Sequence, residues 1–386
     1  MLLPAGTNVR VLQVAAKSFT LANFALPLMV RLREAGFEVD ALGGLDGFEG
    51  RVQASGFTLH PWRMGHSFDP LKLWRARRQL AAFLDSHPYD FVHTHCSFAG
   101  IVGNPVAYSR TKNLIYTQHG FYVHEGLNSV SRRAWLAVEK IGLRSAHRVI
   151  CISQAERDLA GSLGVRDEST FVTVPGAGVR TEQFRLSPED RQRRRQALRE
   201  SLGLRPDDAV LLTVSRLTWD KGYREMIDAV RALKASGHQF KFLAAGSGKD
   251  DAGIREAVRR ADLDADFRFL GWRDDVIDLH CAADLFVFAS HREGLPIATI
   301  EAMASGLPVV ASDIPGCREE IEHGRSGLLF RVGDSAELAA AVRSLLADPC
   351  QAERLGEQAK ERARLFDLSH VLDLQLDLYR GLAEGS

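Results

Sequence analysis

Several features are scarce or missing in this 386-residue sequence, and each absence narrows what the chain can be. Its five cysteines are an odd number without a Cys-x-x-Cys pair, which argues against a disulfide framework and a thiolate zinc site. No uncharged apolar run approaches the roughly 18 residues of a membrane-spanning helix. The longest candidate, 294–311, is interrupted by Glu301 and two prolines. The N-terminus lacks a basic start followed by an apolar core, so we expect no secretory signal and a cytoplasmic location.

The sequence also lacks net charge, with 49 basic and 49 acidic side chains. Nucleic-acid-binding domains are usually strongly basic, so we expect no nucleic-acid partner. The balance is nevertheless uneven, since residues 1–180 carry 20 basic and 14 acidic side chains and residues 181–386 carry 29 and 35. A dense basic cluster comprises Arg63, Lys72, Arg75, Arg77 and Arg78. It is compatible with a solvated helix face, or with a surface that meets phospholipid or a pyrophosphate carrier.

Short apolar runs alternate with longer helical patterns along most of the chain. Strand-like runs in the first half are Val9–Val14, Glu38–Leu42, Phe57–Pro61, Phe91–His95, Asn113–Thr117 and Val149–Ile152. Those in the second half are Val210–Val214, Gln239–Ala244, Phe267–Leu270, Leu285–Ala289, Pro308–Ala311 and Gly327–Phe330. This alternation predicts an α/β fold of doubly wound parallel sheets whose ligands bind at the carboxyl ends of the strands.

A polar, arginine-rich stretch at 181–205 separates the two series of strands. We therefore predict a Rossmann-like N-terminal domain at 1–180 and a second Rossmann-like domain at 181–365. The remaining residues, 366–386, form an amphipathic helix that is able to pack back on the N-terminal domain. Two such domains facing each other across a cleft would place the ligand site in that cleft.

Candidate phosphate-binding loops follow two strands of the second half. Arg216 and Lys221 come after Val210–Val214 and just before a helical pattern, which concentrates positive charge where a phosphate would bind. The alternative is a pair of exposed cations on a loop. The loop Ala244–Gly248 has neither P-loop spacing nor a dinucleotide fingerprint, and it is equally compatible with a plain turn.

Two glutamates lie eight residues apart in the segment 290–304. Glu293 falls in a strand-to-helix loop, and Glu301 falls two turns into the helix on an otherwise apolar face. A carboxylate buried there costs several kcal/mol unless it is hydrogen-bonded. We therefore expect Glu301 to accept hydrogen bonds from ligand hydroxyls such as those of a ribose, the alternative being an exposed helix acid.

Histidines near the ends of two first-half strands suggest further chemistry. His119 follows Asn113–Thr117 on the cleft side, where it could hydrogen-bond a substrate or transfer protons; a structural histidine is the alternative. The stretch His93–Cys96 offers nitrogen and sulfur ligands for a metal ion. Two of them could converge on one ion, but the sequence shows no third or fourth ligand. The acidic pattern at 262–266 fits a solvated turn better than a metal site.

At this point the motifs resemble a known family. Residues 210–345 match the C-terminal half of GT-B glycosyltransferases of family four, in Ser215-Arg216-Leu217, Lys221-Gly222, Gly271-Trp272, Ala283–Val287, Glu293–Pro296, Glu301–Ala304 and Gly306–Ala311. The first half is also similar, in Glu34–Val39, Asp90–His95, Thr117–Gly120 and Ile152-Ser153. It looks like the subgroup that makes surface and exopolysaccharides on lipid-linked acceptors.

The resemblance implies a retaining, metal-independent enzyme without a cofactor. It would transfer a hexose-type sugar from a nucleoside diphosphate sugar, with UDP favoured, to a lipid-linked saccharide in cell-surface polysaccharide synthesis. Arg216 and Lys221 would hold the donor diphosphate, and Glu301 would hold the ribose. The basic cluster would face the acceptor or an anionic membrane, which would make the enzyme peripheral on the inner face of that membrane.

By the same resemblance, Glu293 would contact hydroxyls of the donor sugar, helped by the backbone around Gly294 and Leu295. His119 would lie near the transferred sugar and the acceptor. Two departures stand out. The loop Ala15–Thr20 lacks the glycines that family members often carry there, and Arg180 replaces an Asp that often follows Gly178-Val179.

Four alternative functions are compared with this pattern. A sugar-nucleotide epimerase or hydrolase of the same fold would need acid/base carboxylates, and a related transferase could act on a soluble acceptor. A non-catalytic sugar-nucleotide-binding module would not require the full set of site residues. A nicotinamide enzyme would need the glycine fingerprint that is missing here.

Overall fold

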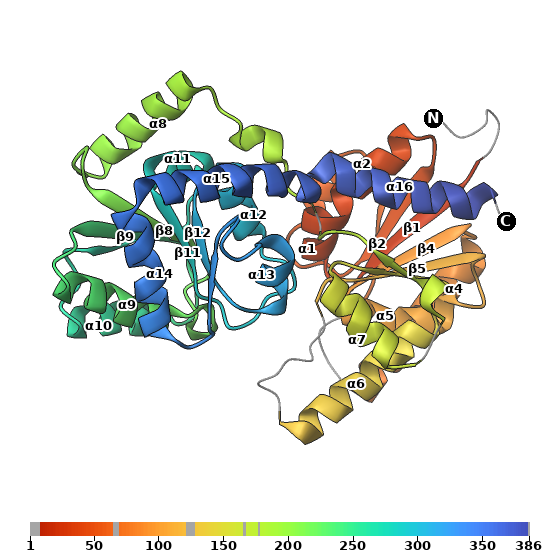
Figure 1. The fold of residues 1–386 in the computed structure, drawn as a ribbon. Coiled ribbons are helices and arrows are strands. Elements are labelled where there is room, and N and C mark those ends of the chain that lie inside the picture. Colours follow the sequence, from red (N-terminus) through yellow and green to blue (C-terminus); the bar gives the residue numbers. More distant parts are fainter. Residues whose placement is uncertain (1–7, 65–68, 121–127, 165–166, 177, 385–386) are drawn as a thin grey trace. The chain divides into compact units, whose positions relative to one another are not determined.

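A computed structural model describes residues 8–64, 69–120, 128–164, 167–176 and 178–384 (Figure 1). The chain divides into two compact units. The N-terminal unit contains Met1–Ala177 together with Ser369–Ser386, and the C-terminal unit contains Gly178–Leu368. These limits, at 177/178 and 368/369, differ by three residues from those placed at 180 and 365 on the sequence.

The N-terminal unit is built on a parallel seven-stranded sheet in the order β3-β2-β1-β4-β5-β6-β7. Its strands are β1 (Arg10–Ala15), β2 (Glu38–Gly43), β3 (Leu59–Pro61), β4 (Phe91–His95), β5 (Asn113–Gln118), β6 (Arg148–Cys151) and β7 (Phe171–Thr173). The central strands are buried on both faces, which explains their nearly continuous apolar sequences. The strand order reverses between β1 and β4, as in doubly wound folds.

Helices cover both faces of this sheet. They are α1 (Ser18–Thr20), α2 (Leu26–Glu34), α3 (Glu49–Ala54), α4 (Pro70–Ser86), α5 (Cys96–Ala107), α6 (Ser129–Arg144), α7 (Gln154–Ser162) and α16 (Leu368–Glu384). Apolar side chains of α4 and α5 pack on one face, and those of α2 and α16 pack on the other. Asp69 begins α4 by accepting a 2.9 Å hydrogen bond from the Leu71 amide, and Pro70 occupies the first turn.

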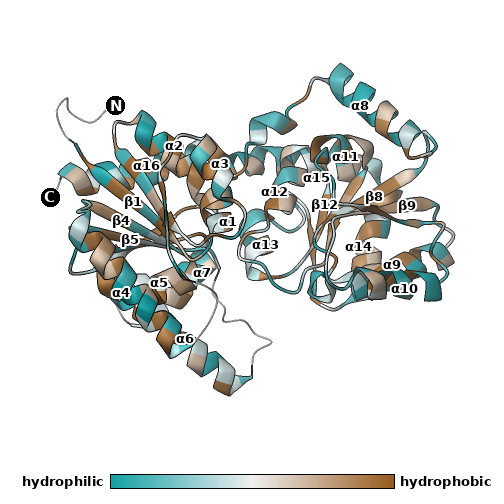
Figure 2. Cartoon of the chain, turned by 180° about the vertical axis from the view of Figure 1, so that it is seen from behind, coloured by the Kyte–Doolittle hydropathy of each residue, from teal (hydrophilic) through white to brown (hydrophobic). Residues whose placement is uncertain are grey.

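The C-terminal unit is built on a parallel six-stranded sheet in the order β10-β9-β8-β11-β12-β13. Its strands are β8 (Ala209–Val214), β9 (Phe240–Ala245), β10 (Phe267–Gly271), β11 (Leu285–Phe288), β12 (Val309–Ser312) and β13 (Leu328–Phe330). Its helices are α8 (Pro188–Ser201), α9 (Tyr223–Ala235), α10 (Asp251–Arg260), α11 (Val276–Ala282), α12 (Ile297–Ala304), α13 (Pro315–Glu320), α14 (Ser335–Ala347) and α15 (Pro349–Ala363). The strands are mostly hydrophobic between more polar outer helices (Figure 2).

The polar stretch 181–205 belongs to the C-terminal unit, the domain to which the sequence assigned it, and contains helix α8. Arg199 is 4% exposed and donates hydrogen bonds to the carbonyls of Ala282 and Asp208. Arg195 and Arg199 both pair with Asp284, at 2.5 and 2.7 Å. The arginines therefore tie α8 to the end of α11, which a local sequence pattern does not reveal.

Candidate active site

Two loops at the carboxyl edge of the C-terminal sheet carry the central polar contact of the candidate site. β8 leads into a short 3₁₀ turn, Trp219–Lys221, and β11 leads into the loop 289–296. The strand order reverses between these two adjacent strands, which is where doubly wound sheets bind ligands. The Lys221 ammonium and the Glu293 carboxylate form an ion pair across the two loops.

This ion pair is sheltered and supported by further hydrogen bonds. The side chains of Lys221 and Glu293 are 8% and 22% exposed. The Ser290 hydroxyl donates a 3.0 Å hydrogen bond to the same Glu293 oxygen, and the His291 amide donates to the Asp220 carbonyl at 2.9 Å. The two loops are therefore held in a defined geometry, which keeps a positive charge fixed at the edge of the sheet.

Gly222 allows the two loops to approach each other this closely. Its φ is +75°, and a Cβ atom there would lie 2.0 Å from the Ala289 carbonyl oxygen. Only glycine accommodates both the left-handed backbone and the contact. Gly237 has a similar φ of +82° but nothing within 4 Å of its Cβ position, so it provides a matched control.

We expect Gly222→Ala to destabilise the protein by about 3 kcal/mol or more, because backbone strain and a backbone clash act together. Gly237→Ala should cost only about 1–2 kcal/mol, the strain alone. Urea unfolding followed by circular dichroism measures both. Equal losses in the two variants would contradict the close packing of these loops.

Arg216 is exposed on the loop after β8, and its guanidinium makes no hydrogen bond within the described part of the chain. The neighbouring loop 244–248 has a packing role. Cβ atoms at Gly246 and Gly248 would lie 1.9 and 2.3 Å from the carbonyl oxygens of Ser215 and Leu217. These glycines let the loop after β9 support the backbone that presents Arg216.

Glu301 lies on α12, half-buried and without a hydrogen-bond partner among the described residues. Burial raises the pKa of its carboxyl to about 7. Its sequence neighbours Ile300, Ala302 and Met303 are buried. Glu301 lies one turn into the helix rather than the predicted two, because α12 begins only at Ile297. A partly desolvated carboxylate with no protein donor is suited to a ligand that supplies hydroxyl donors.

The backbone at Gly294 and Leu295 belongs to the same edge of the sheet. Both residues are half-buried between Glu293 and α12. Gly316 in α13 packs against Glu293 and Gly294, since a Cβ atom there would lie 2.5 Å from the Gly294 carbonyl oxygen. Of the predicted site residues, Lys221 and Glu293 are therefore in contact. Arg216, Glu301 and the backbone of Gly294 and Leu295 lie at the same carboxyl edge, but they are not hydrogen-bonded to this ion pair.

His119 belongs to the N-terminal unit, directly after β5 at the carboxyl edge of its sheet. Its ring lies between Phe24 and His95, with centroid separations of 5.3 and 5.4 Å. Burial lowers the pKa of His119 to about 4, so the imidazole is neutral at physiological pH. It can therefore donate one hydrogen bond and accept another.

The two metal-like patterns have other roles in the structure. His93 and His95 are hydrogen-bonded to protein groups, and burial raises the pKa of the Cys96 thiol to about 12. Asp266 pairs with Lys234 and Lys241. Within the described ranges, no group of three or more His, Cys, Asp or Glu side chains is placed to hold a metal ion.

The predicted basic cluster lies on and before α4. All five of its side chains are exposed, namely those of Arg63, Lys72, Arg75, Arg77 and Arg78. Two apolar side chains of the same helix are also exposed, Leu71 at 53% and Trp74 at 52%. The guanidinium of Arg78 lies 4.9 Å from the centre of the Trp74 ring. No helix in the described segments is long and apolar enough to cross a bilayer.

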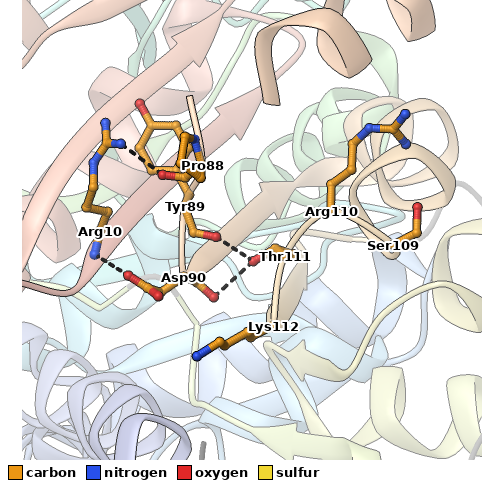
Figure 3. Close-up of a pocket in the computed structure, with 8 residues that line it drawn as sticks. All are labelled: Arg10, Pro88, Tyr89, Asp90, Ser109, Arg110, Thr111 and Lys112. Atoms are coloured by element: carbon orange, nitrogen blue, oxygen red, sulfur yellow. Dashed lines mark hydrogen bonds between the residues drawn. The ribbon is translucent and has the colours of Figure 1, made fainter. Parts of the chain in front are cut away.

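A cavity of about 570 Å³ lies at the opposite edge of the N-terminal sheet (Figure 3). It is lined by residues at or before the amino ends of β1, β4 and β5, namely Arg10, Pro88, Tyr89, Asp90, Ser109, Arg110, Thr111 and Lys112. Parallel sheets bind ligands at their carboxyl edge, whereas this cavity lies at the edge opposite His119 in the same sheet.

Comparisons with known proteins agree with the geometry of the two units. Residues 20–177 match the protein family described as "Glycosyl transferase 4-like domain". Residues 194–362 match the family described as "Glycosyl transferases group 1". The chain is 29% identical over 383 residues to EpsD of Bacillus subtilis (strain 168), covering 96% of each. It is 30% identical over 321 residues to D-inositol 3-phosphate glycosyltransferase 1 of Catenulispora acidiphila, covering 77% of this chain and 73% of that protein.

The chain belongs to the glycosyl transferases group 1 family.

One solved structure shows the fold of this group 1 glycosyltransferase. Anabaena Alr3699/HepE in complex with UDP superposes with a TM-score of 0.80 at 23% identity, covering 97% of this chain and 100% of that one. The predicted GT-B fold of two Rossmann-like units is confirmed.

A third relative is named for its lipid-linked substrate. The Campylobacter jejuni N,N'-diacetylbacillosaminyl-diphospho-undecaprenol alpha-1,3-N-acetylgalactosaminyltransferase is 22% identical over 363 residues, covering 92% of this chain and 94% of the relative. Other relatives are named for capsular polysaccharide and amylovoran biosynthesis. This group 1 glycosyltransferase therefore has relatives in polysaccharide biosynthesis.

Reasoning from the sequence missed the side chains that are linked to His119 through His95. Gln13 and Tyr379 are 366 positions apart in the chain, yet their side chains are hydrogen-bonded at 3.0 Å behind His95. The only sequence signal was alternation, because His93 and His95 on one strand had to point to the same face of the sheet.

Proposed function

We propose that this glycosyltransferase moves a hexose-type sugar from a nucleoside diphosphate sugar, with UDP as the favoured nucleotide, to a lipid-linked saccharide. We further propose that transfer retains the anomeric configuration and requires no metal. The observation that supports this most is the sheltered Lys221–Glu293 ion pair at the point where the strand order reverses. It supplies a fixed cation for a diphosphate and a carboxylate for sugar hydroxyls.

In this proposal, Lys221 and Arg216 bind the diphosphate and stabilise the negative charge that develops as it leaves. Glu301 accepts hydrogen bonds from the ribose hydroxyls. Glu293 accepts them from the donor sugar, beside the backbone of Gly294 and Leu295. The leaving phosphate accepts the proton of the acceptor hydroxyl as the new glycosidic bond forms on the same face of the sugar, so no protein base is required.

The N-terminal unit would bind the acceptor, with His119 near the transferred sugar. Support for a lipid-linked acceptor comes from the C. jejuni relative named above and from the basic cluster on α4. Exposed arginines beside an exposed tryptophan are typical of surfaces that bind anionic lipid. The enzyme would then work as a peripheral protein on the inner face of the membrane.

One observation favours a second candidate, a sugar-nucleotide hydrolase or epimerase. The pKa of Glu301 near 7 lies in the range of a general acid or base. Such an enzyme would convert a nucleotide sugar with no acceptor present, releasing free sugar or an epimer. Proton NMR of the chain with UDP-glucose alone tests this, and a transferase should leave nearly all of the donor intact.

The donor assignment is tested by a thermal-shift panel of UDP-, GDP-, ADP- and dTDP-glucose, with and without EDTA. We expect one nucleotide, UDP, to raise the melting temperature most, with or without the chelator. Stabilisation by none of the four would contradict the donor site. Stabilisation that EDTA abolishes would contradict metal-independent binding.

The basic cluster gives a prediction about membranes. Changing Arg75, Arg77 and Arg78 together to Glu should weaken sedimentation with vesicles containing phosphatidylglycerol about a hundredfold, since each basic residue at an anionic surface contributes about 1 kcal/mol. Trp74→Ala should also weaken it, but by less.

The matched control reverses three arginines on a helix of the other unit, Arg255, Arg259 and Arg260 of α10. This variant should pellet with vesicles as the wild-type protein does. Unchanged pelleting of the α4 variant, or equal losses in both variants, would show that α4 is not the membrane-binding face.

A further inference from the structure

Buried polar side chains form a continuous hydrogen-bonded chain beneath His119 in the N-terminal unit. Gln13 of β1, His93 and His95 of β4, Thr117 of β5 and Tyr379 of α16 are each at most 4% exposed. Strand register explains why they meet. Gln13 is paired with His93 and Thr117 with His95, and alternate residues of a strand share a face.

The contacts follow one another without a break. Thr117 Oγ1 lies 2.6 Å from His93 Nε2, and His93 Nδ1 lies 2.8 Å from the Tyr379 hydroxyl. Gln13 Nε2 lies 3.0 Å from that hydroxyl, while Gln13 Oε1 lies 2.7 Å from His95 Nε2. Finally, His95 Nδ1 lies 3.1 Å from His119 Nε2. The chain therefore runs from Thr117 of β5 to the candidate active-site histidine, and Tyr379 of α16 lies in its middle.

The Gln13 amide sets the direction of the hydrogen bonds on both sides. Its Oε1 atom only accepts, so His95 carries its proton on Nε2. A neutral His95 then has a lone pair on Nδ1, which accepts from His119 Nε2–H. On the other side, Gln13 donates to the Tyr379 oxygen and the Tyr379 hydroxyl donates to His93.

Charge does not disturb this pattern near neutral pH. Burial lowers the pKa of His93 to about 3 and that of His119 to about 4, and it lowers the pKa of His95 well below its usual value. All three imidazoles are therefore neutral, each with one donor nitrogen and one acceptor nitrogen. Reversing the Gln13 amide would reverse every hydrogen bond and place the His119 proton on Nδ1.

We propose that Gln13, His95 and Tyr379 are positioning residues that hold His119 as its Nε2–H tautomer, so that its Nδ1 lone pair is available to a substrate hydroxyl. The inference rests on the proposed function, in which His119 contacts the sugar or the acceptor. It assigns α16 a part in orienting that histidine in addition to packing. An imidazole whose tautomer is fixed in advance needs no rearrangement when the hydroxyl arrives.

The experiment combines nitrogen-15 NMR of histidine-labelled protein with steady-state kinetics. In the wild-type protein, His119 should show a protonated Nε2 and an unprotonated Nδ1. Gln13→Met removes both contacts of the amide, and Tyr379→Phe removes only the hydroxyl. In each variant we expect a mixture of His119 tautomers and a fall in kcat of about tenfold or more, with UDP affinity unchanged.

Tyr89→Phe is the matched control. Tyr89 is also a buried tyrosine of this unit and donates a 2.8 Å hydrogen bond to Asp40, but it lies at the amino edge of the sheet. Loss of the Tyr89 hydroxyl should lower the free energy of unfolding about as much as Tyr379→Phe does, without altering the His119 tautomer or kcat.

Three results would overturn the proposal: a wild-type His119 protonated on Nδ1, an unchanged tautomer in both variants, or a kcat that falls equally in Tyr89→Phe. A wild-type protein that binds no UDP would contradict the proposed function instead. The UDP titration therefore separates failure of the inference from failure of that function.

Discussion

Lys221→Ala is expected to reduce sugar transfer by about 10²–10³-fold, the usual effect of removing one preorganised group that stabilises charge in a transition state. The ammonium is 8% exposed beside Glu293, so water cannot replace it easily. Donor binding should weaken as well, because the diphosphate loses its sheltered cation. Turnover of the nucleotide sugar and UDP titration measure the two effects separately.

Lys234→Ala provides the control for this variant. Lys234 is also paired with a carboxylate, Asp266, but Asp266 directly precedes β10 at the amino edge of the same sheet. The control should keep wild-type turnover. Circular dichroism should show both variants folded. Near-wild-type activity in Lys221→Ala would contradict the assignment of the donor diphosphate to this loop.

Glu301→Gln should weaken donor binding and, unusually for a site variant, stabilise the protein at alkaline pH. The carboxylate would accept hydrogen bonds from the ribose, and hydrogen bonds to a charged group contribute about 1.5–3 kcal/mol. We therefore expect a loss of affinity of about 10–100-fold.

The gain in stability has a separate origin, because burial raises the pKa of this carboxyl to about 7.

The sign of that effect follows from proton binding. The folded protein holds the Glu301 proton more tightly than the unfolded chain, whose carboxyl has a pKa of 4.5. The free energy of unfolding therefore falls as pH rises from 4.5 to 7, by up to about 3 kcal/mol. Glu301→Gln removes this penalty, so its advantage should be absent at pH 4 and complete at pH 8.

Thermal unfolding at both pH values measures the difference, with Glu353→Gln as the control. Glu353 is exposed on α15, so its amide variant should unfold like the wild-type protein at pH 4 and at pH 8. An equal change in Glu301→Gln at pH 4 and pH 8, or an undiminished affinity for UDP-glucose, would show that Glu301 is not the buried ribose acceptor.

Local periodicity predicted the sheets well, because parallel strands that are buried on both faces read as continuous apolar runs. Phe91–His95, for example, has the predicted bounds. The edge strand β7, Phe171–Thr173, was missed. Helix α8 was missed because long-range pairs such as Arg199–Asp284 hold it in place rather than a local apolar stripe.

The sequence predicted which edge of the sheet carries the candidate site, but it did not predict the side-chain contacts there. The loops after β8 and β11 lie at the carboxyl edge of one parallel sheet, so Lys221 and Glu293 were both expected at that edge, but their direct contact was not predicted. The shelter of that ion pair depends on Gly222 and Ser290, whose contacts come from the folded chain. The hydrogen bonds beneath His119 also involve a helix at the far end of the sequence, and no local pattern links Tyr379 to Gln13.

The most direct test of the account follows radiolabelled sugar from UDP-glucose, UDP-galactose or UDP-N-acetylglucosamine into a lipid extract that contains diphosphate-linked saccharides. The account predicts label in the organic phase with one of these donors and a product with the donor's anomeric configuration. Lys221→Ala should transfer about 10²–10³-fold less. Inverted configuration would contradict the retaining mechanism. Label that appears only as free sugar, or equal transfer by wild type and Lys221→Ala, would contradict the central claim.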